Sequence, residues 1–472
     1  MAGEPEMRIL HSLLWLLLLS SLLVAALPIT FSTSQLYVFI SSWNGSQWTS
    51  PAIVTKIDYA NATRDCYQRK VFKSSAGNYF VSFFNLSCHS MQYVASSDRS
   101  TWAATTNLTE FGTFPLGSAD FQYPDKQAGI DGCYFLSGSN GATSYWTPFT
   151  LSGLSIVQGS IGGLGGQQRA CGTSVTSNLG GTYDLGIFHR TSTTLVRTHR
   201  SSATSGDSTG SVPFGDPVNA ADSGGNQILN YKTSSPYNMM ALSKGNDKKM
   251  YWSLIQASDY QYVSDPFNDL GVTLGLGFND FCATTEAQNL GDPEKIHLVF
   301  GNSTALYYMK FESDAWSSVT NLGVTGSFPT LAADDSGSLI LTYTANNMIY
   351  YKTKTPAGSW SSSHVLGSGY TNAAYLSCNQ NEDSGEILLV WTANYVPPAP
   401  SAPSNTSRWI GIAAPHVYAA ITLWSLAMII GVGAALARGM NVADLPFIIL
   451  IGLGILICLF VSLAIMSGFM QL

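Results

Sequence analysis

The sequence predicts an all-β fold: a seven-bladed β-propeller closed by pairing N- and C-terminal half blades, followed by a two-helix transmembrane hairpin. Three observations lead to this prediction. Only 11 % of the 472 residues are charged, and the 44 glycines suit a β-rich chain with many turns. Apolar and aromatic strands recur at intervals of roughly 50 residues, the spacing of propeller blades. Two long apolar runs stand near the C-terminus.

Two successive strands define the repeat. One begins near Leu36, Gln92, Ser144, Leu195, Met250, Leu306 and Ile349. The other precedes every copy but the first, as in YFVSFF (79–84), and its last copy, ILLVWTA (387–393), has no partner downstream. Residues 36–55 thus supply outer strands without inner ones, and residues 373–394 supply inner strands without outer ones. We expect these halves to complete one blade, because their pairing removes two open sheet edges.

Two other architectures stay open. An open sandwich is possible in principle, although it does not explain why the leftover halves are complementary. The third repeat, LVRTHRSSATSGDS (195–208), lacks the Trp of the pattern. Six blades with an insertion therefore remain an alternative to seven.

The ends of the chain predict export and anchoring. Residues 1–27 read as a signal peptide, with an uncleaved signal anchor as the alternative. The propeller follows at 34–395, and a Pro/Ser-rich stalk occupies 396–412. Residues 417–437 and 446–468 are predicted transmembrane helices, whose glycines offer contacts to membrane-protein partners. Arg438 in the short loop between them favours a cytoplasmic loop, so the propeller is expected to be extracellular or lumenal, at the cell surface or a secretory-pathway membrane.

Cysteines and glycosylation sequons fit an exported glycoprotein. An even number of cysteines outside the membrane predicts up to three disulfides, and no Cys/His spacing indicates a metal site or a cofactor. These cysteines are Cys66, Cys88, Cys133, Cys171, Cys282 and Cys378, while Cys458 lies in the second predicted span. Sequons for N-linked glycans begin at Asn44, Asn61, Asn85, Asn107, Asn302 and Asn405.

A Trp behind a Ser/Thr-rich turn recurs in SSWNGSQW (41–48), SSDRSTW (96–102) and KTPAGSW (354–360). This pattern resembles a degenerate Asp box, the BNR-type repeat of sialidase-like and lectin-like β-propellers. Only 96–102 keeps the aspartate, as Asp98. In that family the boxes are structural and lie away from the active site. Sialidases also use an arginine triad, a Tyr–Glu pair and an acid Asp, but their Arg-Ile-Pro signature is absent here.

Polar residues precede the innermost strand of most predicted blades, where the ring would bring them to one central mouth. The candidates for ligand binding are Arg64, Asp65, Asp120, Arg169, Gln227 and Asp280. The two arginines could grip a carboxylate, and Asp65, Asp120 and Asp280 are candidates for a general acid and base. The alternative is that the arginines and aspartates pair with each other.

These features favour a membrane-anchored extracellular propeller for recognition or adhesion, with a glycan or a protein bound over the central mouth. A sialidase-like glycoside hydrolase is the alternative, and a structural subunit of a surface or membrane assembly is the second alternative. Enzymatic activity is less favoured than recognition. A net charge of −7 without a basic run disfavours nucleic acid as a partner.

Overall fold

A computed structural model shows how the strands of the repeat pair. It describes residues 35–395 apart from 67, 109–116, 124–130, 139–144, 161, 164–167, 177–182, 191–193, 201–213, 216–224, 232–236, 246, 257–267, 276–279, 287–294, 303, 368–369 and 381–385. The predicted signal peptide, stalk and transmembrane hairpin, with Asn405 and Cys458, lie outside the described residues. Within the described part, no helix has the length and apolar character needed to cross a membrane.

The described strands form seven antiparallel sheets. From the centre of the ring outward, the sheet that holds both ends of the segment consists of β29 (Tyr370–Gln380), β30 (Ile387–Tyr395), β1 (Gln35–Trp43) and β2 (Ala52–Lys56). The next two sheets consist of β3 (Val71–Lys73), β4 (Tyr79–Asn85), β5 (Ser90–Ser96) and β6 (Thr106–Asn107), and of β7 (Gly117–Gln122), β8 (Gly132–Gly138), β9 (Tyr145–Ser152) and β10 (Ser155–Gln158), with β11 (Gly162–Gly163) also on β9.

The other four sheets repeat the same order. They consist of β12 (Gln168–Thr176), β13 (Tyr183–Arg190), β14 (Thr194–Arg200) and β15 (Phe214–Gly215); of β16 (Asn226–Asn230), β17 (Tyr237–Lys244), β18 (Lys249–Gln256) and β19 (Asn268–Thr273); of β20 (Phe281–Thr285), β21 (Lys295–Gly301), β22 (Leu306–Glu312), β23 (Ala315–Trp316) and β24 (Thr320–Asn321); and of β25 (Ser327–Ala333), β26 (Leu339–Ala345), β27 (Met348–Lys354) and β28 (His364–Gly367). The weak third repeat thus forms a sheet, β12–β15, like the others.

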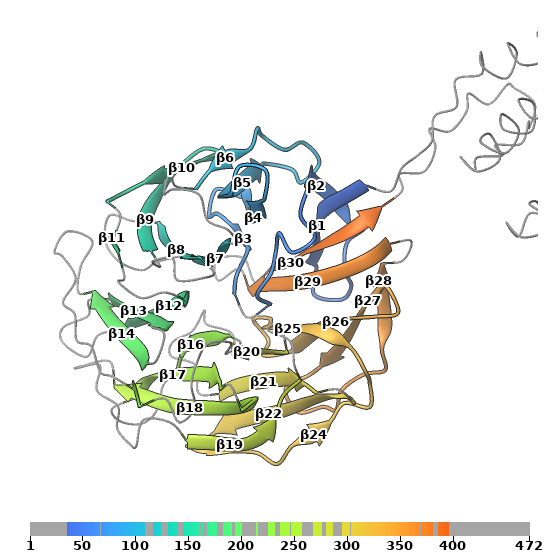
Figure 1. The fold of residues 1–472 in the computed structure, drawn as a ribbon. Coiled ribbons are helices and arrows are strands. Elements are labelled where there is room, and N and C mark those ends of the chain that lie inside the picture. The colour runs from blue at the N-terminus through green and yellow to red at the C-terminus, as the bar shows by residue number, and fades with distance from the viewer. Residues whose placement is uncertain are drawn as a thin grey trace, which may run out of the picture. The chain divides into compact units, whose positions relative to one another are not determined.

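The innermost strands lie next to one another around a central axis, which makes the fold a β-propeller (Figure 1). Contacts run from β7 to β12, then to β16, β20, β25, β29 and β3, and β7 also contacts β4 and β5. Neighbouring innermost strands begin at the same end of the ring. Gln227, the second residue of β16, is hydrogen-bonded to Ala283, the third residue of β20, so the two strands start side by side. We call the face where the innermost strands begin the first face, and the opposite one the second face.

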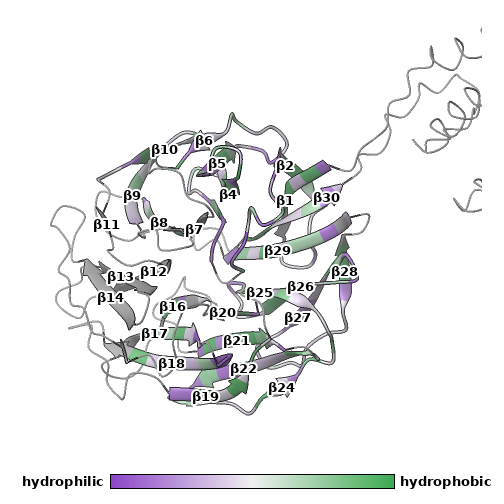
Figure 2. Cartoon of the chain, in the orientation of Figure 1, coloured by the Kyte–Doolittle hydropathy of each residue, from purple (hydrophilic) through white to green (hydrophobic). Residues whose placement is uncertain are grey.

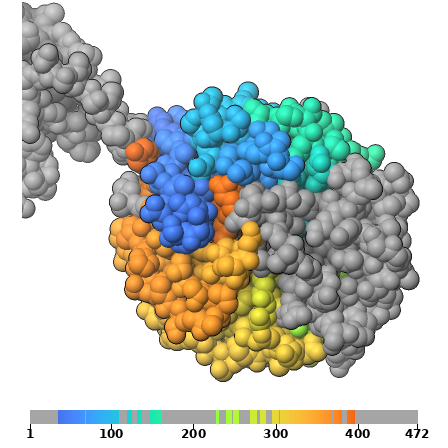
Figure 3. All heavy atoms as spheres, turned by 180° about the vertical axis from the view of Figure 1, so that it is seen from behind, coloured from blue at the N-terminus to red at the C-terminus, as the bar shows by residue number. Residues whose placement is uncertain are grey.

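The sheet that closes the ring joins the two ends of the segment, as predicted. β1 pairs with β30 along its whole length, from Gln35 opposite Tyr395 to Trp43 opposite Ile387. Figure 3 shows the blue residues from the start of the described chain beside the orange residues from its end. The Phe39 ring stacks on the indole of Trp391 with 5.5 Å between centroids, so the two halves also share a buried core.

The recurrent Trp residues pack between neighbouring sheets. Trp360, which follows β27, meets Tyr308 of β22 with 5.4 Å between ring centroids. Trp316 of β23 lies 6.2 Å from Trp252 of β18. Asp98, by contrast, closes its own turn, since its Oδ1 accepts hydrogen bonds from the backbone N–H groups of Ser100 and Thr101 at 2.8 Å. These Trp side chains therefore act as apolar wedges between neighbouring sheets.

Candidate functional site

The connection from β2 to β3 crosses the centre of the ring. We call residues 57–70 the central segment. Figure 1 shows this blue stretch passing through the middle of the ring, and Figure 2 shows that it carries hydrophilic residues. The hydroxyl of Thr63 donates to the carbonyl of Tyr375 in β29 at 2.8 Å, and the thiol of Cys66 donates to the carbonyl of Phe281 in β20 at 3.2 Å. The central segment therefore holds to β29 and β20, the two innermost strands on either side of β25.

Asp120 of β7 binds the end of the central segment. Its carboxylate accepts from Arg69 twice, at Nε (3.0 Å) and Nη2 (2.9 Å), and from the Arg69 backbone N–H at 2.8 Å. Asp120 is buried, so this bidentate ion pair fixes Arg69 against β7. The predicted general acid or base is thus engaged in a structural contact.

Lys70 is a fully buried lysine beside that pair. Its Nζ donates to Gln68 Oε1 at 2.6 Å and to the carbonyl of Ala119. Burial lowers the pKa of Lys70 to about 7, although Asp65 and Asp120 act in the opposite direction. A side chain of this type holds β7 to the central segment at a cost in desolvation.

The remaining predicted ligand residues also make internal contacts where they are described. The Gln227 side chain donates to the Ala283 carbonyl at 2.6 Å and accepts from the Ala283 N–H at 2.9 Å, which joins β16 to β20. Asp280 Oδ2 lies 2.6 Å from Lys244 Nζ. The Arg169 side chain lies outside the described residues. The five candidates whose side chains are described therefore do not form one open polar ring.

One group of side chains lies at the first-face end of the central axis, around Arg64 and Asp65. We call Tyr59, Arg64, Asp65, Phe328 and Tyr375 the mouth cluster. The rings of Phe328 and Tyr375 are 4.6 Å apart, and Arg64 Nε is 3.5 Å from the buried carboxylate of Asp65. Burial raises the pKa of Tyr375; neighbouring Tyr59 and Asp65 also raise it, while Arg64 lowers it. The cluster therefore combines partly exposed aromatic rings with a cation and an anion.

Backbone strain gathers in the same place. Of the eleven described non-glycine residues with positive φ, four lie in or beside the mouth cluster: Asp65 (73°), Phe328 (53°), Asn372 (56°) and Tyr375 (56°). Bulky residues rarely adopt this conformation, which costs on the order of 1–3 kcal/mol each. In Phe328 and Tyr375 it accompanies irregular register in β25 and β29. Sequence reasoning identified Arg64 and Asp65 but missed both aromatic residues, since each lies within a strand.

The described cysteines correct the disulfide prediction. Cys88, Cys282 and Cys378 are free thiols, and the Cys66 thiol donates to Phe281, so three disulfides among the six cysteines are not formed. The buried Cys282 thiol has a local partner, since its Sγ lies 3.7 Å from the hydroxyl of Thr330. Burial raises the pKa of Cys282 to about 11, which keeps it protonated at neutral pH.

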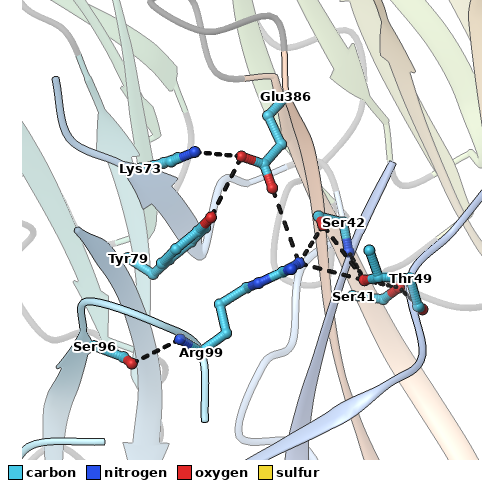
Figure 4. A network of polar contacts seen from close by, with 8 residues as sticks. All are labelled: Ser41, Ser42, Thr49, Lys73, Tyr79, Ser96, Arg99 and Glu386. Carbon is cyan, nitrogen blue, oxygen red and sulfur yellow. Dashed lines mark hydrogen bonds and ion pairs between the residues drawn. The ribbon is translucent and has the colours of Figure 1, made fainter. Parts of the chain in front are cut away.

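A polar network on the second face joins the closing sheet to the sheet of β3–β6 (Figure 4). Glu386, just before β30, lies 2.6 Å from Lys73 Nζ and 3.9 Å from Arg99 Nη1, and accepts from the Tyr79 hydroxyl at 3.4 Å. Arg99 also donates to the hydroxyl of Ser42 in β1. Although burial lowers it, the bonds to Glu386 and Tyr79 raise the pKa of Lys73. These contacts hold the closing sheet to the sheet of β3–β6, and we call this junction the seam.

Replacing Glu386 with glutamine is expected to lower the free energy of unfolding by about 1 kcal/mol, because the amide keeps one acceptor but loses the charge that two cations share. Equilibrium unfolding in urea measures this. Glu312→Gln is the matched control, since Glu312 pairs with Lys310 within β22 and joins no two sheets. An equal loss in both variants would mean that the seam contributes nothing of its own.

No family model matches the sequence. No curated protein matches it either. Among solved structures, AofleA from Arthrobotrys oligospora is similar at a TM-score of 0.43 and 10% identity, over 73% of this chain and 93% of that one. The fucose-specific lectin from Aleuria aurantia gives 0.39 and 11%, over 63% and 95%. The Dos1 propeller gives 0.44 and 9%, over 77% and 94%. Likenesses this distant assign neither a family nor a ligand to the chain.

Proposed function

We propose that this chain is a recognition propeller that binds a glycan at the mouth cluster. The observation that carries the proposal is the coincidence of strained backbone, an aromatic pair and Arg64 in the mouth cluster. Strained residues persist only where their surroundings force them, and they gather at ligand sites. Aromatic rings offer apolar faces to the C–H groups of a sugar, while Arg64 and the Tyr59 and Tyr375 hydroxyls can bond to its hydroxyls.

The pairing of the predicted carboxylates supports recognition over hydrolysis. Asp120 is held by Arg69, Asp280 by Lys244, and Asp65 lies beside Arg64. Glycoside hydrolysis needs one carboxyl kept protonated and another kept ionised across the scissile bond. All three carboxylates are instead engaged in ion pairs with cations of the chain itself. A protein ligand at the mouth cluster is the second candidate, since aromatic residues and arginine also dominate protein interfaces.

Binding is tested with the unglycosylated segment 34–396, which forms one compact unit closed by its own terminal strands. On an array of glycans we expect one class to bind, and Tyr375→Leu to weaken that binding at least tenfold through loss of the stacking surface. Tyr307→Leu is the matched control, because Tyr307 is a partly exposed tyrosine stacked on Phe300, away from the axis. A folded segment that binds no glycan would refute the glycan proposal.

We infer further that residues 34–395 are a seven-bladed propeller held at a membrane, outside the cell or in the lumen of the secretory pathway. The seven sheets of the described residues and the pairing of β1 with β30 support the blade count. The apolar runs at 417–437 and 446–468 support the anchor. In eukaryotic cells the full chain is expected to stay in the membrane pellet at alkaline pH and to lose mass with peptide N-glycosidase. Release into the supernatant would contradict the anchor.

A further inference from the structure

Asn61 lies on the central segment beside the mouth cluster. It begins the sequon Asn61-Ala62-Thr63. Its side chain is half-buried, and its Nδ2, the atom that a glycan modifies, donates to the Tyr59 hydroxyl at 3.1 Å. Two residues on, Thr63 donates to the carbonyl of Tyr375 at 2.8 Å. The acceptor nitrogen is therefore one hydrogen bond away from a residue of the mouth cluster.

The other described sequons are placed differently. Asn85 ends β4, Asn107 ends β6 and Asn302 follows β21, so all three lie at the first face but on strands outside the innermost ones. Asn44 follows β1, a third strand, and so lies at the second face. Among these five sequons, Asn61 is the one on the central segment.

We propose that Asn61 carries an N-linked glycan that covers the mouth cluster and blocks ligand binding there. This rests on the proposed function and on export of the chain. A glycan on Nδ2 leaves one N–H, so the bond to Tyr59 can persist and hold the first sugar over the mouth cluster. The oligosaccharide then competes with a soluble ligand for the same aromatic and Arg64 surface.

The chemistry requires a donor from the secretory pathway, a lipid-pyrophosphate-linked oligosaccharide. Nδ2 of Asn61 attacks C1 of the first sugar, the C1–O bond to the pyrophosphate breaks, and the lipid pyrophosphate leaves with the electron pair. The amide proton is lost to a base of the transferring enzyme. No oxidant or reductant takes part.

The folded ring limits when the glycan can be attached to Asn61. Thr63 is fully buried and its hydroxyl is used by Tyr375, so the sequon is not accessible once β29 has paired. During synthesis, residue 61 emerges long before residue 375. The transfer therefore precedes closure of the ring, and the mouth cluster forms with the glycan already attached.

The test uses the full chain, made in eukaryotic cells and solubilised in mild detergent, as wild type, Asn61→Gln and Asn302→Gln. Glycopeptide mass spectrometry is expected to find Asn61 occupied in the wild type. On the glycan array, Asn61→Gln should bind at least tenfold more than the wild type, and Asn302→Gln should match the wild type. Hydroxyl-radical footprinting should show Phe328 and Tyr375 protected in the wild type and exposed in Asn61→Gln.

Three results separate this inference from the proposed function. An unoccupied Asn61, or equal footprints of Phe328 and Tyr375 in all three proteins, overturns the inference whatever the array shows. Equal binding by the wild type and Asn61→Gln also overturns it, while leaving the proposed function intact. If the footprints differ as expected but the unglycosylated segment 34–396 binds no glycan, the Asn61 glycan does cover the mouth cluster. The proposal that the ligand is a glycan is then refuted.

Discussion

Replacing Trp391 with alanine is expected to lower the free energy of unfolding by about 3–5 kcal/mol, the usual range for a buried Trp. Trp391 of β30 is fully buried. Its indole stacks on Phe39 of β1 and meets Tyr370 of β29 edge to face, with 6.0 Å between ring centroids. One side chain thus packs against two strands from opposite ends of the segment. Equilibrium unfolding of segment 34–396 in guanidinium chloride measures the loss.

Trp360→Ala is the control for this variant. Trp360 is a partly buried wedge between two sheets that are consecutive in the chain, and it contacts Tyr308. Its removal is expected to cost less than half as much, because less apolar surface is lost from the core. If Trp391→Ala unfolded no more readily than Trp360→Ala, the closing sheet would not be the part of the ring that depends most on a single side chain.

The architecture of the ring was largely readable from the sequence. The half repeats at residues 36–55 and 373–394 are complementary, and β1 does pair with β30. The signal is strong because each sheet needs the same alternation of buried strands and turns, so the pattern recurs along the chain. Even the weak repeat after Leu195, which lacks its Trp, forms the sheet of β12–β15.

The centre of the ring was not readable in the same way. The prediction placed Arg64, Asp65 and Asp120 at equivalent positions around an open mouth, as repeats imply. The central segment breaks that equivalence. Residues 57–70 link β2 to β3, whereas residues 322–326 suffice to link β24 to β25. The length of the first connection was the available signal, since a long connection between strands has room to fold inward.

The mouth cluster escaped prediction for a physical reason. Phe328 and Tyr375 belong to β25 and β29, and the sequence alone marks them as ordinary core residues. Their exposure depends on irregular register in both strands, which turns the side chains out of the regular alternation. The bond from Thr63 to the Tyr375 carbonyl joins residues far apart in the sequence, and no local pattern encodes such a contact.

Because Lys70 is buried, we expect its contribution to the free energy of unfolding to rise as the pH increases from 7 to 10. The pKa of Lys70 is about 7 in the folded chain, against an ordinary value of 10.5, because burial disfavours its charge. Between these values the unfolded chain binds more protons at this position than the folded chain. Its stability contribution is therefore lowest below pH 7 and improves as the pH rises, by on the order of 3–5 kcal/mol over the whole interval.

Other groups titrate in the same range, so the measurement compares the wild type with Lys70→Met at each pH. Methionine has a similar length and no charge, although it leaves Gln68 Oε1 and the Ala119 carbonyl without their donor. That loss is independent of pH. We therefore expect the difference in unfolding free energy between wild type and Lys70→Met to shift by a few kcal/mol toward the wild type from pH 7 to 10.

Lys73→Met provides the control, because the pKa of Lys73 is shifted in the opposite direction. The pKa of Lys73 is raised by Glu386 and Tyr79 despite burial, so its contribution is present at neutral pH and is lost only as the pH rises through that raised value. Lys73 and Lys70 are close in sequence, yet only the Lys70→Met difference should change between pH 7 and 10, because Lys73 stays charged in the folded and the unfolded chain over that range. Parallel curves for wild type and Lys70→Met would show that Lys70 stays charged in the folded ring, and that Asp65 and Asp120 outweigh its burial.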